Sequence, residues 1–309
     1  MITAVEKSFT LKHHRYFWQQ TQIEACATPS PNRSRKEIIM QQFRLEHSPI
    51  TYYLSGREQR EWVLFLHAAF VDHNMFREQI SYFQKRYNVL TLDIIGHGQS
   101  TDTKKGDSIL SMSPWLSDIL KKEQIDRIHI AGISLGAVLA QDFANRYPHA
   151  VKSLACFGGY DINNFDPGMQ KENAAAQMRM MAKALFSVKW FAKANKKISA
   201  YTAQAQNDFY EMNLKFPKKS FRYLASLQKM VNRFPSVPRN YPLLIGCGAF
   251  DIPAEHTAVD LWKAHEPDCS VAILEHAGHC ANMDAPNEFN KVLDTFFTNP
   301  PAHCCGTTA

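Results

Sequence analysis

A serine between two glycines is the first feature of this 309-residue chain that indicates chemistry. The pentapeptide "GISLG" at residues 132–136 follows the apolar run "RIHIA" and precedes a segment with helical spacing. Where a strand turns sharply into a helix, small glycines let the backbone pass, and the residue between them stands at the positive end of the helix. The pattern predicts that the Ser134 hydroxyl is exposed at a sheet edge, although the five letters alone are common by chance.

Nucleophilic catalysis by a serine needs a base and a carboxylate that orients it, and both follow later in the chain. Asp251 lies in "GAFDIP", just beyond a predicted strand, and His279 lies in "AGHCAN", in a loop after the next strand. The order Ser134, Asp251, His279 is the one expected when a nucleophile stands on a strand-to-helix turn. We expect Ser134 to attack a carbonyl carbon, His279 to take its proton and Asp251 to hold the imidazole.

The elements that must position these residues form an alternating pattern. Short apolar runs such as "WVLFL", "NVLTL", "RIHIA" and "VKSLACF" alternate with segments of helical spacing, and "IIMQQFRL" with "ITYYLSG" indicates a hairpin. This alternation predicts an α/β fold with a mostly parallel central sheet and helices on both faces. The strand pattern stops near residue 160, after the sixth strand, and resumes at "YPLLIGCG".

The expected organisation has five parts. Residues 1–36 are an N-terminal extension that ends in a Pro/Ser/basic stretch, and residues 300–309 are a disordered tail. Residues 37–159 and 240–299 form the α/β core, with residues 160–239 inserted as a helical cap. The cap's own core is expected from its larger apolar side chains, some of which line an apolar substrate pocket: Met178, Met180, Met181, Phe186, Trp190 and Phe191.

Several motifs together resemble the α/β-hydrolase superfamily, specifically its cap-bearing serine hydrolases. They are "LHAAF" at residues 66–70, "DIIGHGQS" at 93–100, the serine turn, "GAFDIP" and "AGHCANMDAP". The resemblance spans about residues 40 to 298 and implies that the N–H groups of Leu135 and Ala69 hold the oxyanion. Ala68 stands where the family usually has glycine. Either that position needs a glycine-only backbone, or its methyl group narrows the pocket.

Other residues compete for the same roles. Asp161 follows the sixth strand, where some members of the family carry their acid, and His276 lies three residues before His279. We prefer Asp251 as the acid, and His279 as the base because it follows the glycine that opens the loop. His67 and His97 are interpreted as hydrogen-bonding loop histidines, Asp93 as structural and Cys280 as a packed thiol.

Composition and charge indicate which partners and which cellular compartment to expect. The net charge of +6 is not gathered into an arm with stacking aromatics, so nucleic acid is not an expected partner. Seven cysteines without framework or zinc-site spacing indicate a reducing compartment, and no signal peptide or membrane span is visible. We therefore expect a cytoplasmic protein with no metal or other cofactor. The sequence leaves the oligomeric state open.

Charge within the predicted cap bears on the substrate. Residues 160–239 hold 14 Lys and Arg against 5 Asp and Glu, a net charge of +9, so the remainder carries −3. A basic lid attracts anionic substrates or an acidic partner, although a solvated helical face is the commoner explanation of such a charge excess.

The predicted function is a serine hydrolase that cleaves a small ester, thioester or lactone through an acyl-enzyme. C–C bond hydrolysis and acyl transfer to another acceptor use the same triad and remain open. The alternative from another class is a ligand-sensing or partner-binding regulator with slow residual hydrolysis.

Overall fold

The computed structural model of this protein describes residues 40–56, 59, 61–165, 186–234 and 239–299. The chain divides into two units, Met1–Glu37 and Ile38–Ala309, and all the described residues belong to the second. The predicted N-terminal extension (residues 1–36) and the predicted tail (residues 300–309) lie outside the described residues.

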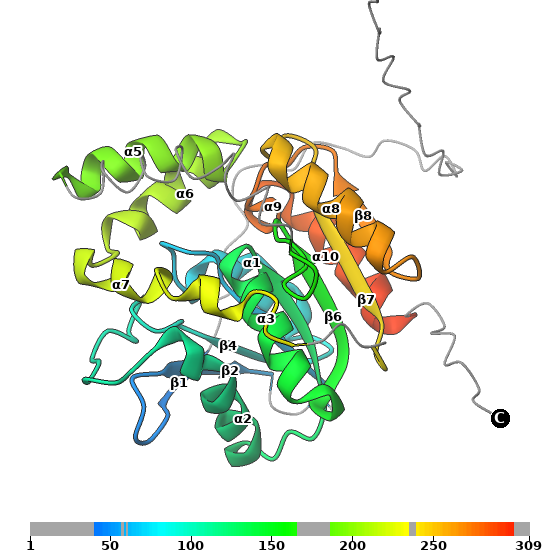
Figure 1. The fold of residues 1–309 in the computed structure, drawn as a ribbon, viewed down its shortest axis with the longest axis horizontal. Helices are drawn as coiled ribbons and strands as arrows, with labels where there is room; N and C mark the ends of the chain where they lie inside the picture. Colours follow the sequence, from blue (N-terminus) through cyan, green and yellow to red (C-terminus); the bar gives the residue numbers. More distant parts are fainter. Residues whose placement is uncertain (1–39, 57–58, 60, 166–185, 235–238, 300–309) are drawn as a thin grey trace, which may run out of the picture. The chain divides into compact units, whose positions relative to one another are not determined.

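Eight strands form one sheet in the order β1-β2-β4-β3-β5-β6-β7-β8. Figure 1 labels strands from the two ends of this order, β1 and β2 at one end and β7 and β8 at the other. Their bounds are β1 (Gln41–Arg44), β2 (Thr51–Ser55), β3 (Trp62–Leu66), β4 (Asn88–Leu92), β5 (Ile128–Ile133), β6 (Val151–Phe157), β7 (Leu243–Gly248) and β8 (Ser270–Leu274). Strand β2 pairs antiparallel with β1 and with β4, and the other pairs are parallel. The predicted hairpin and the mostly parallel sheet are confirmed.

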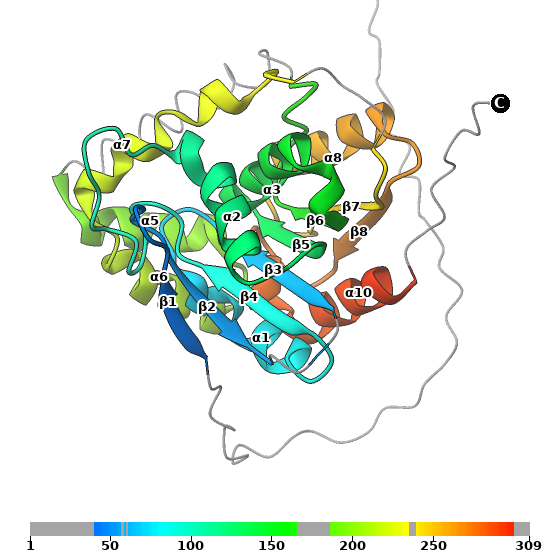
Figure 2. The same cartoon turned by 90° about the horizontal axis from the view of Figure 1, so that it is seen from below.

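Helices cover both faces of this sheet (Figure 2). The hydrophobic core on one face contains apolar residues of α2 (Met112–Lys122), α3 (Leu135–Arg146) and α8 (Pro253–His265). The core on the other face contains apolar residues of α1 (Arg77–Phe83), α9 (Ala281–Asp284) and α10 (Pro286–Thr298). Strand β3 contributes side chains to both cores because successive side chains of a strand point to opposite faces of the sheet. Leu64 and Leu66 pack into the first core, and Val63 and Phe65 pack into the second.

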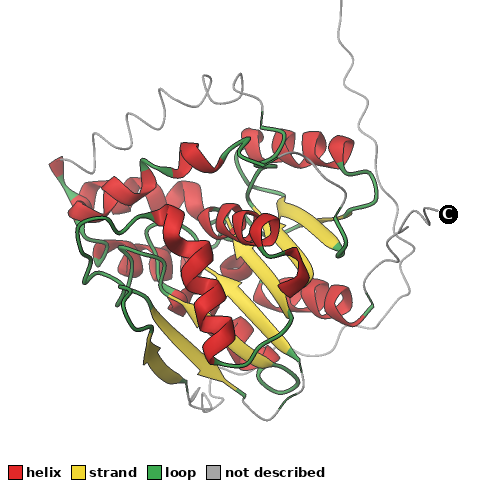
Figure 3. Cartoon of the chain, turned by 60° about the horizontal axis from the view of Figure 1, so that its bottom comes forward, coloured by secondary structure: helices red, strands yellow, loops and turns green. Residues whose placement is uncertain are grey.

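Between β6 and β7 the described segment contains helices and no strand. Figure 1 labels the helices α5, α6 and α7 there, and Figure 3 draws all described helices in red. We call residues 186–234 the helical insertion; it contains α5 (Val188–Ser199), α6 (Ala203–Leu214) and α7 (Phe221–Leu224), joined by short turns. The side chains of Ser187 and Thr202 cap α5 and α6 by accepting backbone N–H groups. The described part of the predicted cap is thus helical. No helix among the described residues is long and apolar enough to cross a membrane.

The expected interior of the insertion is correct only in part. Phe191 is 2% exposed, but Phe186 is 80% exposed and Trp190 is 53% exposed, so for these two the prediction of a core position is wrong. The buried face of α5 carries Phe191, Ala192, Asn195 and Ser199, and Trp190 precedes that face by one residue. The methionines at positions 178, 180 and 181 lie outside the described residues.

Candidate active site

Ser134 occupies a strained turn between β5 and α3. Its backbone has φ 53° and ψ −112°, in a region that residues other than glycine rarely adopt. The Ser134 N–H donates to the Phe157 carbonyl at 2.8 Å, and the Ser134 carbonyl accepts from the Ala137 N–H at 2.9 Å. The turn is therefore fixed by the end of β6 and by the first turn of α3. Ser134 is partly exposed, whereas Ile133 and Leu135 on either side are buried.

The two glycines flanking this turn have no room for a side chain. A Cβ atom on Gly132 would lie 2.4 Å from the Gly136 carbonyl oxygen, and one on Gly136 would lie 2.0 Å from the Leu66 oxygen. These are contacts with backbone, which cannot move aside as a flexible side chain can. The second contact also shows that the start of α3 packs against the end of β3.

Asp251 and His279 are in direct contact. The Nδ1 atom of His279 lies 3.1 Å from each carboxylate oxygen of Asp251, whose Oδ1 also accepts the Ile252 N–H at 2.8 Å. The Asp251 side chain is buried, and that of His279 is 17% exposed. Burial alone would lower the pKa of His279, but the charge of Asp251 and its hydrogen bond outweigh burial and raise that pKa above its ordinary value. With the Nδ1–H donated to Asp251, Nε2 is left as the proton acceptor.

The segment after β6 links this pair to the serine turn. Gly158 directly follows Phe157, the residue whose carbonyl holds the Ser134 N–H. A Cβ atom on Gly158 would lie 3.0 Å from both Cε1 and Nδ1 of His279, and one on Gly159 would lie 3.9 Å from the backbone carbonyl oxygen of Ser134. The imidazole and the serine turn therefore flank the same two glycines at the carboxyl edge of the sheet.

The competing acid and base lie elsewhere. The Asp161 carboxylate accepts the Asn163 N–H at 2.9 Å and the Asn164 side-chain amide at 2.8 Å, and its nearest histidine is His265, at 3.6 Å. His276 is exposed in the turn before the histidine loop. Of these candidates, the structure brings together only Asp251 and His279.

The predicted oxyanion donors come from the end of β3 and the start of α3. Within the described part of the chain, the N–H groups of Ala69 and Leu135 have no hydrogen-bond acceptor. Ala68 does not have a positive φ, so its backbone is ordinary and alanine is tolerated there; its N–H donates to the Met75 sulfur at 3.2 Å. Phe70 has the positive φ in this loop, 71°. Position 68 therefore does not need a backbone conformation that only glycine adopts.

Two buried histidines hold the neighbouring loops. His67 Nδ1 donates to the Ala68 carbonyl at 2.7 Å, and its Nε2 accepts the Ile94 N–H at 2.9 Å, which requires a neutral ring. His97 Nδ1 donates to the Ile95 carbonyl at 3.1 Å. Burial lowers the pKa of both histidines, that of His97 to about 3. Their interpretation as loop histidines agrees with this geometry.

The Asp93 carboxylate is buried and accepts several hydrogen bonds. It accepts the Tyr53 hydroxyl at 2.9 Å, the His73 N–H at 3.0 Å, the His73 ring nitrogen at 2.8 Å and the Gln99 N–H at 2.8 Å. Burial alone would raise the pKa of Asp93, but the hydrogen bond and charge of His73 outweigh it and lower the pKa to about 2. Asp93 therefore joins the loop after β3 to the loop after β4.

A cluster of phenylalanines joins the helical insertion to the loop after β3 that carries Ala69, the predicted oxyanion loop. The ring of Phe70 lies with its centroid 4.9 Å from that of Phe191, 5.2 Å from that of Phe216 and 5.5 Å from that of Phe221. The side-chain amide of Asn213 also donates to the Phe70 carbonyl at 3.4 Å. The loop that carries the Ala69 N–H therefore packs directly against the insertion.

Asp284 is a residue that the sequence analysis did not single out. Its carboxylate accepts the Gly278 N–H at 2.9 Å, the Tyr201 N–H at 2.9 Å, and the N–H and hydroxyl of Thr202 at 2.7 and 2.9 Å. Gly278 precedes His279, whereas Tyr201 and Thr202 lie between α5 and α6. The sequence offers no signal for this role, because it depends on segments far apart in the chain.

Glu255 is a second residue that sequence reasoning missed. It lies in the first turn of α8, and its buried Oε2 has no hydrogen-bond partner among the described residues. Burial raises the pKa of Glu255, opposed by the nearby charge of His279 and reinforced by that of Asp251. In the sequence Glu255 looks like any acidic residue at the start of a helix.

Comparison with known proteins gives one family. The sequence profile of the alpha/beta hydrolase fold matches residues 61–286. Two relatives from Acinetobacter baylyi are each 22% identical: (E)-2-((N-methylformamido)methylene)succinate hydrolase, over 85% of this chain and 100% of that protein, and 3-oxoadipate enol-lactonase 1, over 80% of this chain and 92% of that protein.

A solved structure shares the fold. The malate-bound thermophilic esterase from Thermogutta terrifontis superposes with a TM-score of 0.68 at 16% sequence identity, covering 85% of this chain and 100% of that chain.

Proposed function

Because the chain belongs to the alpha/beta hydrolase fold family and is an enzyme of carboxylesterase-like type, we propose that Ser134, His279 and Asp251 form its catalytic triad. The reaction is hydrolysis of a small ester, thioester or lactone through an acyl-enzyme. The observation that carries this proposal is the contact between Asp251 and His279 beside Gly158 and Gly159, which also border the strained Ser134 turn.

Acylation begins at Ser134. His279 Nε2 takes the hydroxyl proton as the serine oxygen bonds to the carbonyl carbon, and Asp251 stabilises the imidazolium that forms. The C–O⁻ group then accepts hydrogen bonds from the N–H groups of Ala69 and Leu135. When the tetrahedral intermediate collapses, the bond to the leaving group breaks and His279 returns the proton to the departing oxygen or sulfur.

Deacylation repeats these steps with water. His279 takes a proton from water as the water oxygen bonds to the acyl carbon, and the bond to the Ser134 oxygen breaks as His279 protonates it. The product is a carboxylic acid. Because Ser134 and His279 act as a unit, removal of either is expected to lower the rate about as much as removal of both.

We assign the helical insertion the role of a cap. It contacts the oxyanion loop through Phe70 and the histidine loop through Asp284, so it borders the proposed site on two sides. Its excess of positive charge favours substrates with a carboxylate. The names of the two relatives refer to a succinate derivative and to 3-oxoadipate, both dicarboxylates, and the similar esterase structure contains bound malate.

We further propose that the enzyme works in the reducing cytoplasm. The four described cysteines are buried free thiols: Cys156, Cys247, Cys269 and Cys280. Burial raises the pKa of the Cys280 thiol, so this neighbour of His279 stays protonated and packed rather than reactive. Mass spectrometry of the protein alkylated without reductant is expected to find no disulfides.

The function is tested with two p-nitrophenyl esters whose acyl chains end in a methyl group or in a carboxylate, p-nitrophenyl butyrate and mono-p-nitrophenyl succinate, each corrected for its uncatalysed hydrolysis. We expect turnover of both, with the higher kcat/KM for the succinate ester at low salt. His279→Ala is expected to reduce kcat on the order of 10⁴–10⁶-fold, whereas His276→Ala, a matched change three residues away, retains it. Equal loss in both variants, or no turnover of esters, thioesters and lactones by the wild type, would contradict the proposal.

A further inference from the structure

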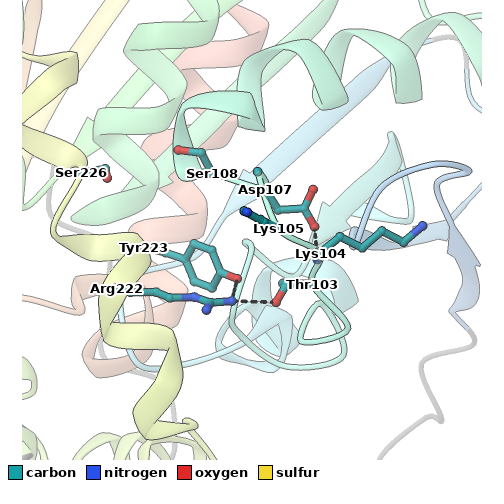
Figure 4. A pocket seen from close by; sticks show the side chains of 9 residues that line it. Thr103, Lys104, Lys105, Asp107, Ser108, Arg222, Tyr223 and Ser226 are labelled. Atoms are coloured by element: carbon teal, nitrogen blue, oxygen red, sulfur yellow. Dashed lines mark hydrogen bonds between the residues drawn. The ribbon is translucent and has the colours of Figure 1, made fainter.

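A recess that the proposed triad does not line lies between a core loop and the helical insertion. It has a volume of about 470 Å³ and is lined by residues 103–108, in the loop between β4 and α2, and by Arg222, Tyr223 and Ser226 of the insertion (Figure 4). We call it the loop–insertion pocket. Neither the triad nor the oxyanion donors line it, so the catalytic assignment leaves the pocket unexplained.

The Arg222 guanidinium is held in place at this pocket. One terminal nitrogen donates to the Tyr223 hydroxyl at 2.6 Å and to the Thr103 hydroxyl at 3.2 Å, and the guanidinium carbon lies 4.8 Å from the centroid of the Tyr223 ring. Two of the five N–H donors of the arginine are thus used, which leaves three with no acceptor among the described residues. A fixed guanidinium with spare donors loses less side-chain entropy when it binds an anion.

The remaining lining adds positive charge and hydroxyl donors. Lys104 and Lys105 lie on the core loop; in Figure 4, Lys105 extends toward the side where Ser108 lies, while Lys104 extends away from it. The Ser108 oxygen accepts the Leu110 N–H at 3.3 Å, which leaves its own proton to donate. Asp107 is the acid in the lining, and one of its oxygens accepts the Lys104 N–H at 2.7 Å.

We propose that the loop–insertion pocket binds the phosphate group of a small phosphorylated molecule. The Arg222 guanidinium, the Lys105 ammonium group and several hydroxyls line the recess from two segments, and a tetrahedral dianion has enough oxygens to accept from several of them at once. A carboxylate has only two oxygens and carries one charge. This inference does not depend on the hydrolase activity.

Binding of a phosphorylated ligand at this pocket would stabilise the packing of the insertion against the core. Tyr223 already packs on the turn after β4, since a Cβ atom on Gly96 would lie 2.7 Å from the Tyr223 ring. The adjoining Phe221 lies 5.5 Å, ring to ring, from Phe70 of the oxyanion loop. A ligand that bridges Arg222 and the core loop therefore holds α7 against its neighbours and raises the melting temperature by mass action.

The experiment is calorimetric titration of the full chain at constant ionic strength, with inorganic phosphate, glycerol 3-phosphate and succinate as separate probes. We expect saturable binding of both phosphates, tighter than that of succinate. Arg222→Gln is expected to weaken phosphate binding at least about tenfold. Arg233→Gln removes the same charge from the insertion outside the pocket and is expected to change affinity less than twofold.

Two further variants keep the result interpretable. Lys105→Gln changes an exposed side chain of the pocket and is expected to weaken phosphate binding several-fold even if Arg222→Gln fails to fold. Ser134→Ala is expected to bind phosphate as the wild type does, which separates this pocket from the triad. No saturable phosphate binding, equal losses in the Arg222 and Arg233 variants, or succinate binding that is as tight as phosphate binding and is weakened equally by Arg222→Gln would each overturn the proposal.

Discussion

The backbone N–H of Cys280 donates to the carbonyl of Ser199 at 2.7 Å, so the residue after the proposed base is bonded to the last residue of α5. Asp284 makes the second link, from Gly278 to the start of α6. The loop that carries His279 is therefore bonded to the helical insertion on both sides of the histidine. Movement of the insertion and placement of the base are coupled through these bonds.

Loss of the Asp284 carboxylate is expected to reduce activity without unfolding the protein. Asp284→Ala leaves the Gly278 and Thr202 N–H groups without their acceptor and loosens the histidine loop. Misplacement of a catalytic group by about 1 Å costs on the order of 10²-fold in rate, so we expect kcat to fall about 10- to 100-fold. The control is Asp268→Ala, an exposed acid at the turn before β8. Equal kinetics for the two variants would exclude this positioning role.

Gly158 is expected to be essential for the position of the imidazole. Gly158→Ala adds strain at φ 58° and a methyl group 3.0 Å from the His279 ring, so kcat should fall at least about tenfold. Gly106→Ala is the matched control, because Gly106 has φ 101° but nothing within 4 Å of its added Cβ. It should lose stability by about 1–2 kcal/mol and keep its ester hydrolysis rate. An active Gly158→Ala enzyme would show that the ring is free to move.

The pH dependence of kcat/KM follows from the His279–Asp251 pair. The negative charge of Asp251 raises the pKa of His279, and the protonated imidazole cannot accept the Ser134 proton. Activity is therefore lost as pH falls, with a midpoint above 6.5, the ordinary pKa of histidine. Asp251→Asn is expected to lower kcat on the order of 10⁴-fold and to shift the midpoint to lower pH. A wild-type midpoint below pH 6 would contradict the ion pair.

Acid stability is expected to depend on Asp93. Its folded-state pKa of about 2 lies below the ordinary 3.8, so its contribution to stability is present above pH 4 and is lost as pH falls through about 2. The difference corresponds to about 2 kcal/mol. Asp93→Asn should therefore melt lower than the wild type at pH 5, and the gap should narrow toward pH 2. An exposed control, Asp118→Asn, should show no such gap at either pH.

The sequence predicted the sheet, the covering helices and the Asp251–His279 pair because each leaves a local signature. Strand and helix periods differ, and "GAFDIP" and "AGHCAN" follow two successive strands of the sheet. The roles of Ser134 as nucleophile, of His279 as base and of Asp251 as its acid partner remain predictions. So does the assignment of Ala69 and Leu135 as oxyanion donors. The positive φ of Phe70 leaves no such signature in the sequence. The sequence singled out Ala68, two residues earlier, only because the family usually has glycine at that position.

Residues that act between distant segments could not be predicted in this way. Asp284 bonds residues more than 80 positions away in sequence, and Arg222 reaches Thr103 across 119 positions. Their types are ordinary for the helices in which they lie, so composition and periodicity carry no information about them. Phe186 and Trp190 are the opposite case. Their apolar types predicted buried positions in the insertion, but both side chains are exposed.

The central claim, that His279 activates Ser134 as a nucleophile, is tested most directly by labelling with a fluorophosphonate probe and mapping the modified residue by mass spectrometry. The account predicts a single adduct on Ser134 in the wild type, none in Ser134→Ala, and labelling at least about a hundredfold slower in His279→Ala. An adduct on another residue, or undiminished labelling of Ser134→Ala, would contradict it.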